Sequence, residues 1–117
     1  MKKTILITGA SRGIGKETAI LLAKQEYNIV INYNKSEKQA AELKKILTAK
    51  GYTVEIFKAD ITNNLEVDNM IEFCLNKFYN IDVLINNAGI AEIKPFMDLT
   101  STDWNNIINT NLYYNDL

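Results

Sequence analysis

Short runs of Ile, Val and Leu alternate along the chain with longer segments whose apolar residues recur every three or four positions. The continuous runs predict strands that are buried on both faces, and the longer segments predict helices with one apolar side. Four strands are expected, at Lys3–Thr8, Ile29–Ile31, Thr53–Phe57 and Asp82–Ile85. Four helices are expected after them, the first ending near Gln25 and the others opening at Ser36, Asn63 and Thr100.

The same spacing predicts which side of each helix faces the core. The first helix is expected to place Ile14, Thr18 and either Leu21 or Leu22 on one side. The inner positions of the next two helices are expected to be Ala40, Leu43 and Leu47, and then Val67, Met70, Ile71, Cys74 and Phe78.

Local signals predict where elements begin and end. Ser36 with Gln39 three residues later has the pattern of a capping box, and Asn63 with Glu66 opens the following helix. Gly51 is a typical stop for the helix before it. Pro95 predicts a loop.

Strict alternation of strands and helices predicts an α/β fold, a Rossmann-type doubly wound parallel sheet with helices on both faces. Right-handed crossovers leave few topologies, and we expect the strand order 3-2-1-4 within a single domain, residues 1–117. In such sheets the ligand binds at the carboxyl ends of the strands, where the strand order reverses. The expected binding edge is therefore the carboxyl end of the first strand.

Composition narrows the function classes. The 117 residues are 47% hydrophobic and 23% charged with a net charge of −1, which argues against nucleic acid or an anionic membrane as a partner. Cys74 is the single cysteine, so an internal disulfide is excluded, a cytoplasmic location is expected, and the thiol is expected in the core. The chain has no histidine, no metal site is expected, and acid–base chemistry must use another residue type.

A glycine-rich turn, Thr8–Gly15, joins the first strand to the first helix. A strand, a glycine turn and a helix in this order direct backbone N–H groups and the positive helix end at one point, which suits a phosphate. The glycines fall at positions 9, 13 and 15, which matches neither the G-x-G-x-x-G pattern nor a P-loop. The alternative is a turn that only lets the helix pack closely on the strand.

The segment Thr8-Gly9-x-x-x-Gly13-x-Gly15, together with Asn86-Asn87-Ala88-Gly89, closely resembles the short-chain dehydrogenase/reductase family. The resemblance implies an oxidoreductase that uses a nicotinamide dinucleotide, with Asp60 contacting the adenine ring and Asn111 holding a water in the proton relay. The cofactor contacts that it implies are Thr8, Gly9, Ser11, Arg12, Gly13, Ile14, Gly15, Tyr33, Asn34, Lys35, Ser36, Asp60, Ile61, Asn87, Ala88 and Gly89.

The expected cofactor is NADP(H) rather than NAD(H). A carboxylate at the tip of the second strand would bind the ribose of NAD, but no acidic residue occurs there before Glu37. Arg12, Lys35 and the Ser36 hydroxyl can instead bind a 2′-phosphate through charge-assisted hydrogen bonds. The alternative is that the two cations are solvated surface charges.

The resemblance covers only the first half of the family's fold. Members are about twice as long and carry a serine and a Tyr-x-x-x-Lys pair, whereas none of the six tyrosines here is followed four residues later by lysine. We therefore expect a truncated reductase that is inactive alone and whose fourth strand is an open edge. Asn32–Glu37 and Asp103-Trp104 look most like the 3-oxoacyl-[acyl-carrier-protein] reductase branch of fatty acid biosynthesis.

That branch implies a small-molecule or acyl-carrier-linked carbonyl substrate and a homo-oligomeric complete form. Two other hypotheses remain, a nucleotide-binding module without turnover and an inert truncated product.

Overall fold

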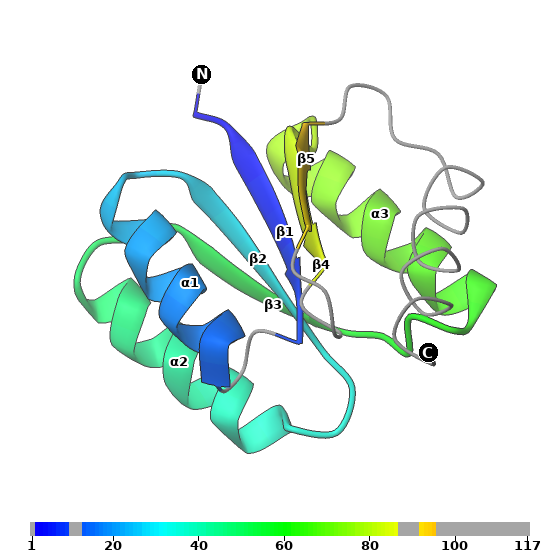
Figure 1. The fold of residues 1–117 in the computed structure, drawn as a ribbon, viewed down its shortest axis with the longest axis horizontal. Helices are drawn as coiled ribbons and strands as arrows, with labels where there is room; N and C mark the ends of the chain where they lie inside the picture. Colours follow the sequence, from blue (N-terminus) through cyan, green and yellow to red (C-terminus); the bar gives the residue numbers. More distant parts are fainter. Residues whose placement is uncertain (1, 10–12, 87–91, 96–117) are drawn as a thin grey trace.

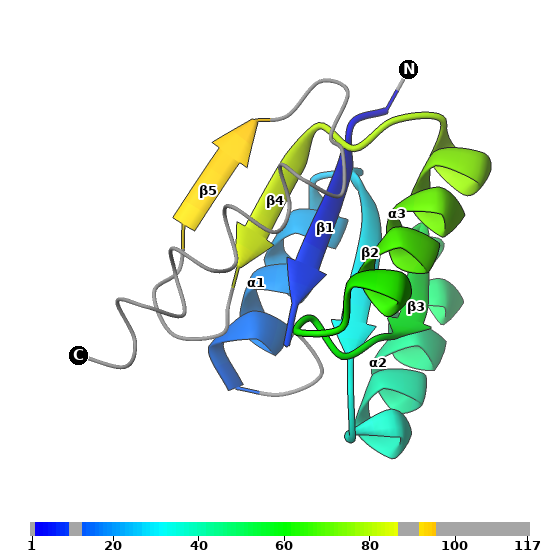
Figure 2. The same ribbon diagram turned by 90° about the vertical axis from the view of Figure 1, so that its right-hand side faces the viewer.

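The computed structural model describes residues 2–9, 13–86 and 92–95. Its five-stranded sheet has the order β3-β2-β1-β4-β5 (Figure 2). The strands are β1 (Thr4–Thr8), β2 (Asn28–Tyr33), β3 (Val54–Lys58), β4 (Val83–Asn86) and β5 (Glu92–Pro95). The first four are parallel, which confirms the predicted order 3-2-1-4.

The fifth strand corrects one expectation. β5 pairs with β4 in the antiparallel direction, so the predicted open edge of the fourth strand is covered, and Pro95 ends a strand rather than marking a loop. Proline lacks an N–H group and is tolerated in an edge strand such as this one.

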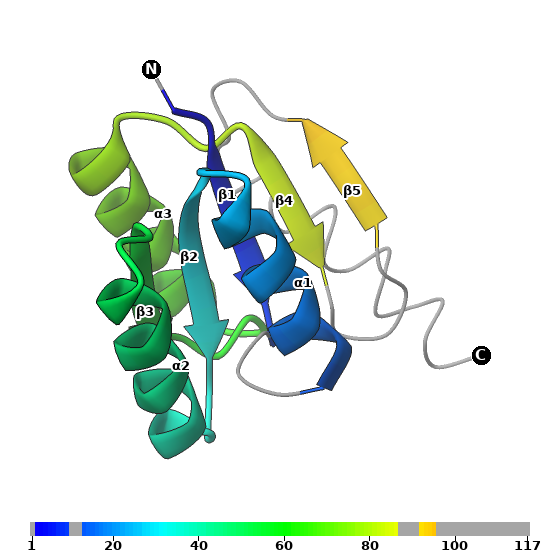
Figure 3. The ribbon, with the colours of Figure 1, turned by 90° about the vertical axis from the view of Figure 1, so that its left-hand side faces the viewer.

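The helices lie in two layers around the sheet. Helices α1 (Gly13–Lys24) and α2 (Glu37–Ala49) lie on one face, and α3 (Asn64–Phe78) lies on the other (Figures 1 and 3). Alternate strand residues supply the two cores: Ile5, Ile29 and Ile31 pack with α1 and α2, whereas Leu6, Val30 and Leu84 pack with α3. The predicted inner residues of α2 are buried, as are those of α3 except the partly buried Phe78.

The side of α1 predicted from Ile14, Thr18 and either Leu21 or Leu22 is not its most deeply buried side, although Leu22 is partly buried against the core. Its buried residues are Gly15, Ala19 and Ala23, while Ile14 is 76% and Leu21 58% exposed. Thr18 uses its hydroxyl to donate to the carbonyl of Ile14, at 2.9 Å. Small residues occupy the side of α1 that faces the sheet, because they let the helix backbone approach the sheet closely. Of the larger apolar side chains, Ile14 and Leu21 are exposed, whereas Ile20 and Leu22 are partly buried against this core.

The predicted helix ends hold in two places and fail in one. Asn63 Oδ1 accepts from the Glu66 N–H at 3.1 Å, and Gly51 follows α2 with φ of +87°. Ser36 occupies the N-cap position of α2, but its side chain makes no capping hydrogen bond, because its backbone (φ −92°, ψ 52°) is not the extended one that a side-chain cap needs.

Two further predictions concern burial and the end of the chain. Cys74 is fully buried in the α3 core, as predicted. The helix expected from Thr100 lies outside the described residues. Within the described part of the chain, no helix has the length and apolar character needed to cross a membrane.

Candidate functional site

The turn after β1 has the backbone that its glycines predict. Gly9 and Gly13 adopt φ of 63° and 67°, in the left-handed region where a side chain is disfavoured. A Cβ built on Gly13 would meet no atom within 4 Å, so the requirement for glycine there is conformational rather than steric. Helix α1 begins at Gly13, directly at the carboxyl edge of the sheet.

This end of α1 fits an anionic group. The first-turn N–H groups of a helix have no partner within it and carry the positive end of the helix dipole. The first turn of α1 contains no acidic residue that would repel an anion. The first-turn donors and the positive end of the helix suit a phosphate, so the local structure fits the diphosphate of a dinucleotide.

The end of β2 lies beside this turn. Tyr33 is buried and its carbonyl accepts from the Ala59 N–H at 2.9 Å, whereas Asn34 and Lys35 are exposed and Ser36 is half-buried. The predicted 2′-phosphate ligands Lys35 and Ser36 are thus accessible at the carboxyl edge.

Asp60 follows β3 in a tight turn. Its Oδ1 accepts from the Thr62 hydroxyl at 2.6 Å and from the Thr62 N–H at 2.9 Å. These two bonds lower the pKa of the Asp60 carboxyl, the bond from the Thr62 hydroxyl having the larger effect. The positive charge of Lys35 acts in the same direction. The structure thereby brings the predicted adenine contact and a predicted phosphate ligand into one neighbourhood, while Ile61 packs against the α3 core.

A row of buried polar side chains crosses the same edge of the sheet. Thr8 pairs with Asn32 in the strand register, and Thr8 Oγ1 donates to Asn86 Oδ1 at 3.0 Å. All three residues are at most 3% exposed. They lie two positions after Leu6, Val30 and Leu84, and hence on the α3 side of the sheet. This carboxyl-edge row (Asn32, Thr8, Asn86) joins β2, β1 and β4.

Sequence reasoning missed Asn32. The available signal was that each of the three residues is the first polar position on its side of an apolar run. Other predicted site residues lie outside the described part of the chain; these are Ser11, Arg12, Asn87, Ala88, Gly89 and Asn111. Among the described residues, no cluster of His, Cys, Asp or Glu side chains could hold a metal ion.

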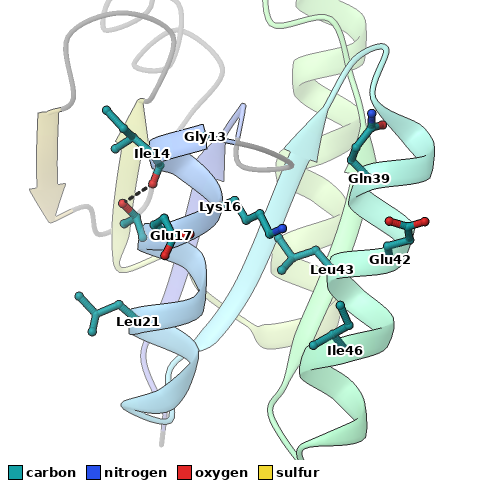
Figure 4. Close-up of a pocket in the computed structure, with 10 residues that line it drawn as sticks. Gly13, Ile14, Lys16, Glu17, Leu21, Gln39, Glu42, Leu43 and Ile46 are labelled. Atoms are coloured by element: carbon teal, nitrogen blue, oxygen red, sulfur yellow. Dashed lines mark hydrogen bonds between the residues drawn. The ribbon is translucent and has the colours of Figure 1, made fainter.

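A groove of about 840 Å³ runs along α1 and α2 (Figure 4). It shares Gly13 and Ile14 with the glycine turn, but the rest of its lining is helix surface. Figure 4 shows Lys16 of α1 reaching toward Leu43 of α2. The acidic groups of Glu17 and Glu42 also line the groove, which makes it a poorer seat for a phosphate than the end of α1.

The chain belongs to the short-chain dehydrogenase family, whose model (short chain dehydrogenase) matches residues 3–113. The 3-oxoacyl-[acyl-carrier-protein] reductase FabG of Staphylococcus epidermidis is 38% identical over 112 residues, which are 96% of this chain and 46% of that reductase. The hydroxynaphthalene reductase-like protein Arp2 of Metarhizium majus is 38% identical over 109 residues, 93% of this chain and 41% of that protein. The chain spans about half the length of the curated relatives that it matches.

Solved structures show the same fold. An NADH-dependent reductase, A1-R′, complexed with NAD superposes with a TM-score of 0.67 at 39% identity, covering 76% of this chain and 37% of that one. A blue fluorescent protein from a metagenomic library in complex with NADPH has a TM-score of 0.69 at 32% identity, covering 86% of this chain and 42% of that one.

Proposed function

We propose that this chain is the dinucleotide-binding half of an NADP(H)-dependent reductase of the short-chain type. The observation that carries the proposal is the turn between β1 and α1, with Gly9 and Gly13 at positive φ and no acidic residue in the first turn of α1. Family membership supports the same reading, since relatives of known structure are described as complexed with NAD or NADPH.

The choice of NADP(H) rests on charge at the end of β2. Both kinds of dinucleotide occur among the relatives, so similarity alone does not choose between them. The segment after Tyr33 presents Asn34, Lys35 and Ser36 and no carboxylate, which favours a 2′-phosphate over a ribose hydroxyl. In this proposal Arg12 adds a second cation, and Asp60 accepts from the adenine amino group.

The nicotinamide supplies the hydride chemistry when it is bound. In this proposal Ile14 contacts the cofactor, the segment Asn87–Gly89 borders it, and Asn111 holds a water of the proton relay. These assignments follow the family resemblance.

The proposed substrate is a ketone such as the carbonyl of a 3-oxoacyl thioester on an acyl carrier. The 38% identity with 3-oxoacyl-[acyl-carrier-protein] reductase FabG supports this class. A homo-oligomeric complete enzyme in the cytoplasm belongs to the same proposal.

Turnover needs groups that these 117 residues do not contain. No tyrosine is followed four residues later by lysine, so the family's proton donor has no counterpart here. We therefore propose that the isolated chain binds the dinucleotide without reducing a ketone, which makes a non-catalytic binding module the second candidate function.

The test is the affinity of the chain for NADPH and for NADH, measured by calorimetry. Arg12→Ala is expected to weaken NADPH binding by roughly tenfold or more while changing NADH binding little, because it removes a charge-assisted hydrogen bond to the 2′-phosphate. Lys24→Ala, at the far end of α1, is the matched control and should change neither affinity. Equal losses of both ligands in Arg12→Ala would overturn the choice of NADP(H).

A further inference from the structure

The buried residue Asn32 makes hydrogen bonds to two segments of the candidate site, at Gly9 and at Ala59. Its Nδ2 donates to the Ala59 carbonyl at 3.0 Å and, more weakly, to the Tyr33 carbonyl at 3.4 Å. Its own backbone carbonyl accepts from the Gly9 N–H at 3.1 Å. Gly9 opens the glycine turn and Ala59 immediately precedes Asp60, so Asn32 links the two ends of the proposed adenosine site.

A buried amide at this position needs a reason. Asn32 is 3% exposed and follows Ile29, Val30 and Ile31, which are fully buried. Burying an amide costs free energy unless its hydrogen bonds are made, whereas a valine or isoleucine would suit the strand without that cost. The ladder between β2 and β3 already holds these strands together. What the side chain adds is a bond to Ala59, one residue beyond β3.

We propose that Asn32 is a positioning residue for the adenosine part of the dinucleotide. It fixes the distance between the Gly9 turn, which receives the diphosphate, and Asp60, which receives the adenine, without touching the ligand. This inference rests on the proposed dinucleotide site. It assigns Asn32 a role in affinity that is separate from its contribution to folding.

The same strand supplies a matched control. Asn28, at the amino end of β2, also makes one side-chain hydrogen bond across strands, from Nδ2 to Thr4 Oγ1 at 3.3 Å. It lies at the amino ends of the strands, whereas the glycine turn follows the carboxyl end of β1. Either substitution removes a side-chain hydrogen bond between β2 and another segment, but only the bond of Asn32 reaches the proposed site, at Ala59.

The experiment is a titration of wild type, Asn32→Ala and Asn28→Ala with NADPH and with adenosine 2′,5′-bisphosphate, below the unfolding temperature of all three. Asn32→Ala should weaken both ligands by about tenfold, the effect of losing one buried hydrogen bond. Asn28→Ala should change either affinity by less than about twofold, even if its unfolding temperature falls as far as that of Asn32→Ala.

The outcomes separate this inference from the proposed function. Wild type that binds neither ligand would overturn both. Wild type that binds, together with Asn32→Ala of unchanged affinity, would overturn the role of Asn32 and leave the dinucleotide site standing. Equal losses in the two variants would show a purely structural role and also overturn the inference.

If Asn32→Ala does not fold, amide hydrogen exchange of wild type and of Asn32→Leu, which keeps the size of the side chain without its donors, gives the test. Adenosine 2′,5′-bisphosphate should slow exchange at the Gly9 and Ala59 N–H groups by at least about tenfold in wild type and by much less in Asn32→Leu. The Asn28 N–H, which donates to the Lys3 carbonyl at 2.9 Å, should change much less. Uniform slowing at all three amides would contradict the positioning role.

Discussion

Thr8 and Asn86 join the carboxyl ends of β1 and β4 through a 3.0 Å hydrogen bond from the threonine hydroxyl to the amide oxygen. Both side chains are 1% exposed. The glycine turn begins directly after Thr8, and the Asn87–Gly89 segment begins directly after Asn86. This bond therefore fixes the carboxyl ends of the two strands from which those segments lead.

Thr8→Val is expected to lower the free energy of unfolding by about 0.5–1.5 kcal/mol, because it keeps the shape of the side chain but removes this hydrogen bond. Urea unfolding followed by circular dichroism measures the change. Thr8→Ser keeps the hydroxyl and should retain most of the stability. A serine variant as unstable as the valine variant would show that packing of the methyl group, and not the hydrogen bond, matters at this position.

A buried leucine of α2 and an exposed leucine of α1 should differ in how much their truncation lowers the free energy of unfolding. Leu43 of α2 is 2% exposed, and Leu43→Ala should lower the free energy of unfolding by about 2–5 kcal/mol. Leu21 is 58% exposed on α1, and Leu21→Ala should cost about 0.5 kcal/mol or less. The measurement is again urea unfolding. Comparable losses in the two variants would mean that Leu21 is buried in solution and that the described packing of α1 is incomplete.

The Asp60 turn predicts a pH dependence on the acid side. Because the folded pKa of Asp60 lies below its ordinary value of 3.8, its stabilising effect is present above that pH and is lost as the pH falls through the lower folded value. The difference in unfolding free energy between wild type and Asp60→Asn should therefore be constant near neutral pH and shrink below pH 3.8. A difference that grows on acidification would contradict the Thr62 hydrogen bonds.

Cys74 should be chemically inert in the folded chain. Burial raises the pKa of its thiol to about 12, so almost no thiolate is present at about pH 8. Native protein treated with iodoacetamide at that pH should stay unmodified by mass spectrometry, while protein in urea should gain one label. Rapid labelling of the native chain would place the thiol at the surface.

The sheet could be predicted from the sequence because its strands are apolar runs that local signals bound, and because right-handed crossovers leave few arrangements. β5 could not, since Glu92-Ile93-Lys94-Pro95 is short, half charged and ends in proline. The inner side of α1 was also missed. Periodicity marks large apolar residues, but the buried positions of α1 are the small residues Gly15, Ala19 and Ala23, which such a pattern does not single out.

Part of the candidate site could also be predicted from the sequence and part could not. Glycine spacing predicted the turn after β1, because only glycine adopts its φ values freely. The hydrogen bonds of Asn32 and Asn86 could not be predicted, since they join residues brought together only by strand pairing. An asparagine at the end of an apolar run gives no sign of which carbonyl it will reach.

The most direct test of the central claim is a titration of isotopically labelled chain with NADPH, followed by amide NMR. The account predicts saturable shifts at the carboxyl edge, at Gly9, Gly13, Lys35 and Asp60, and little change at Asn28 and Thr53 at the opposite edge. Shifts confined to the groove between α1 and α2, or no shifts at saturating NADPH, would contradict a dinucleotide site at the end of β1.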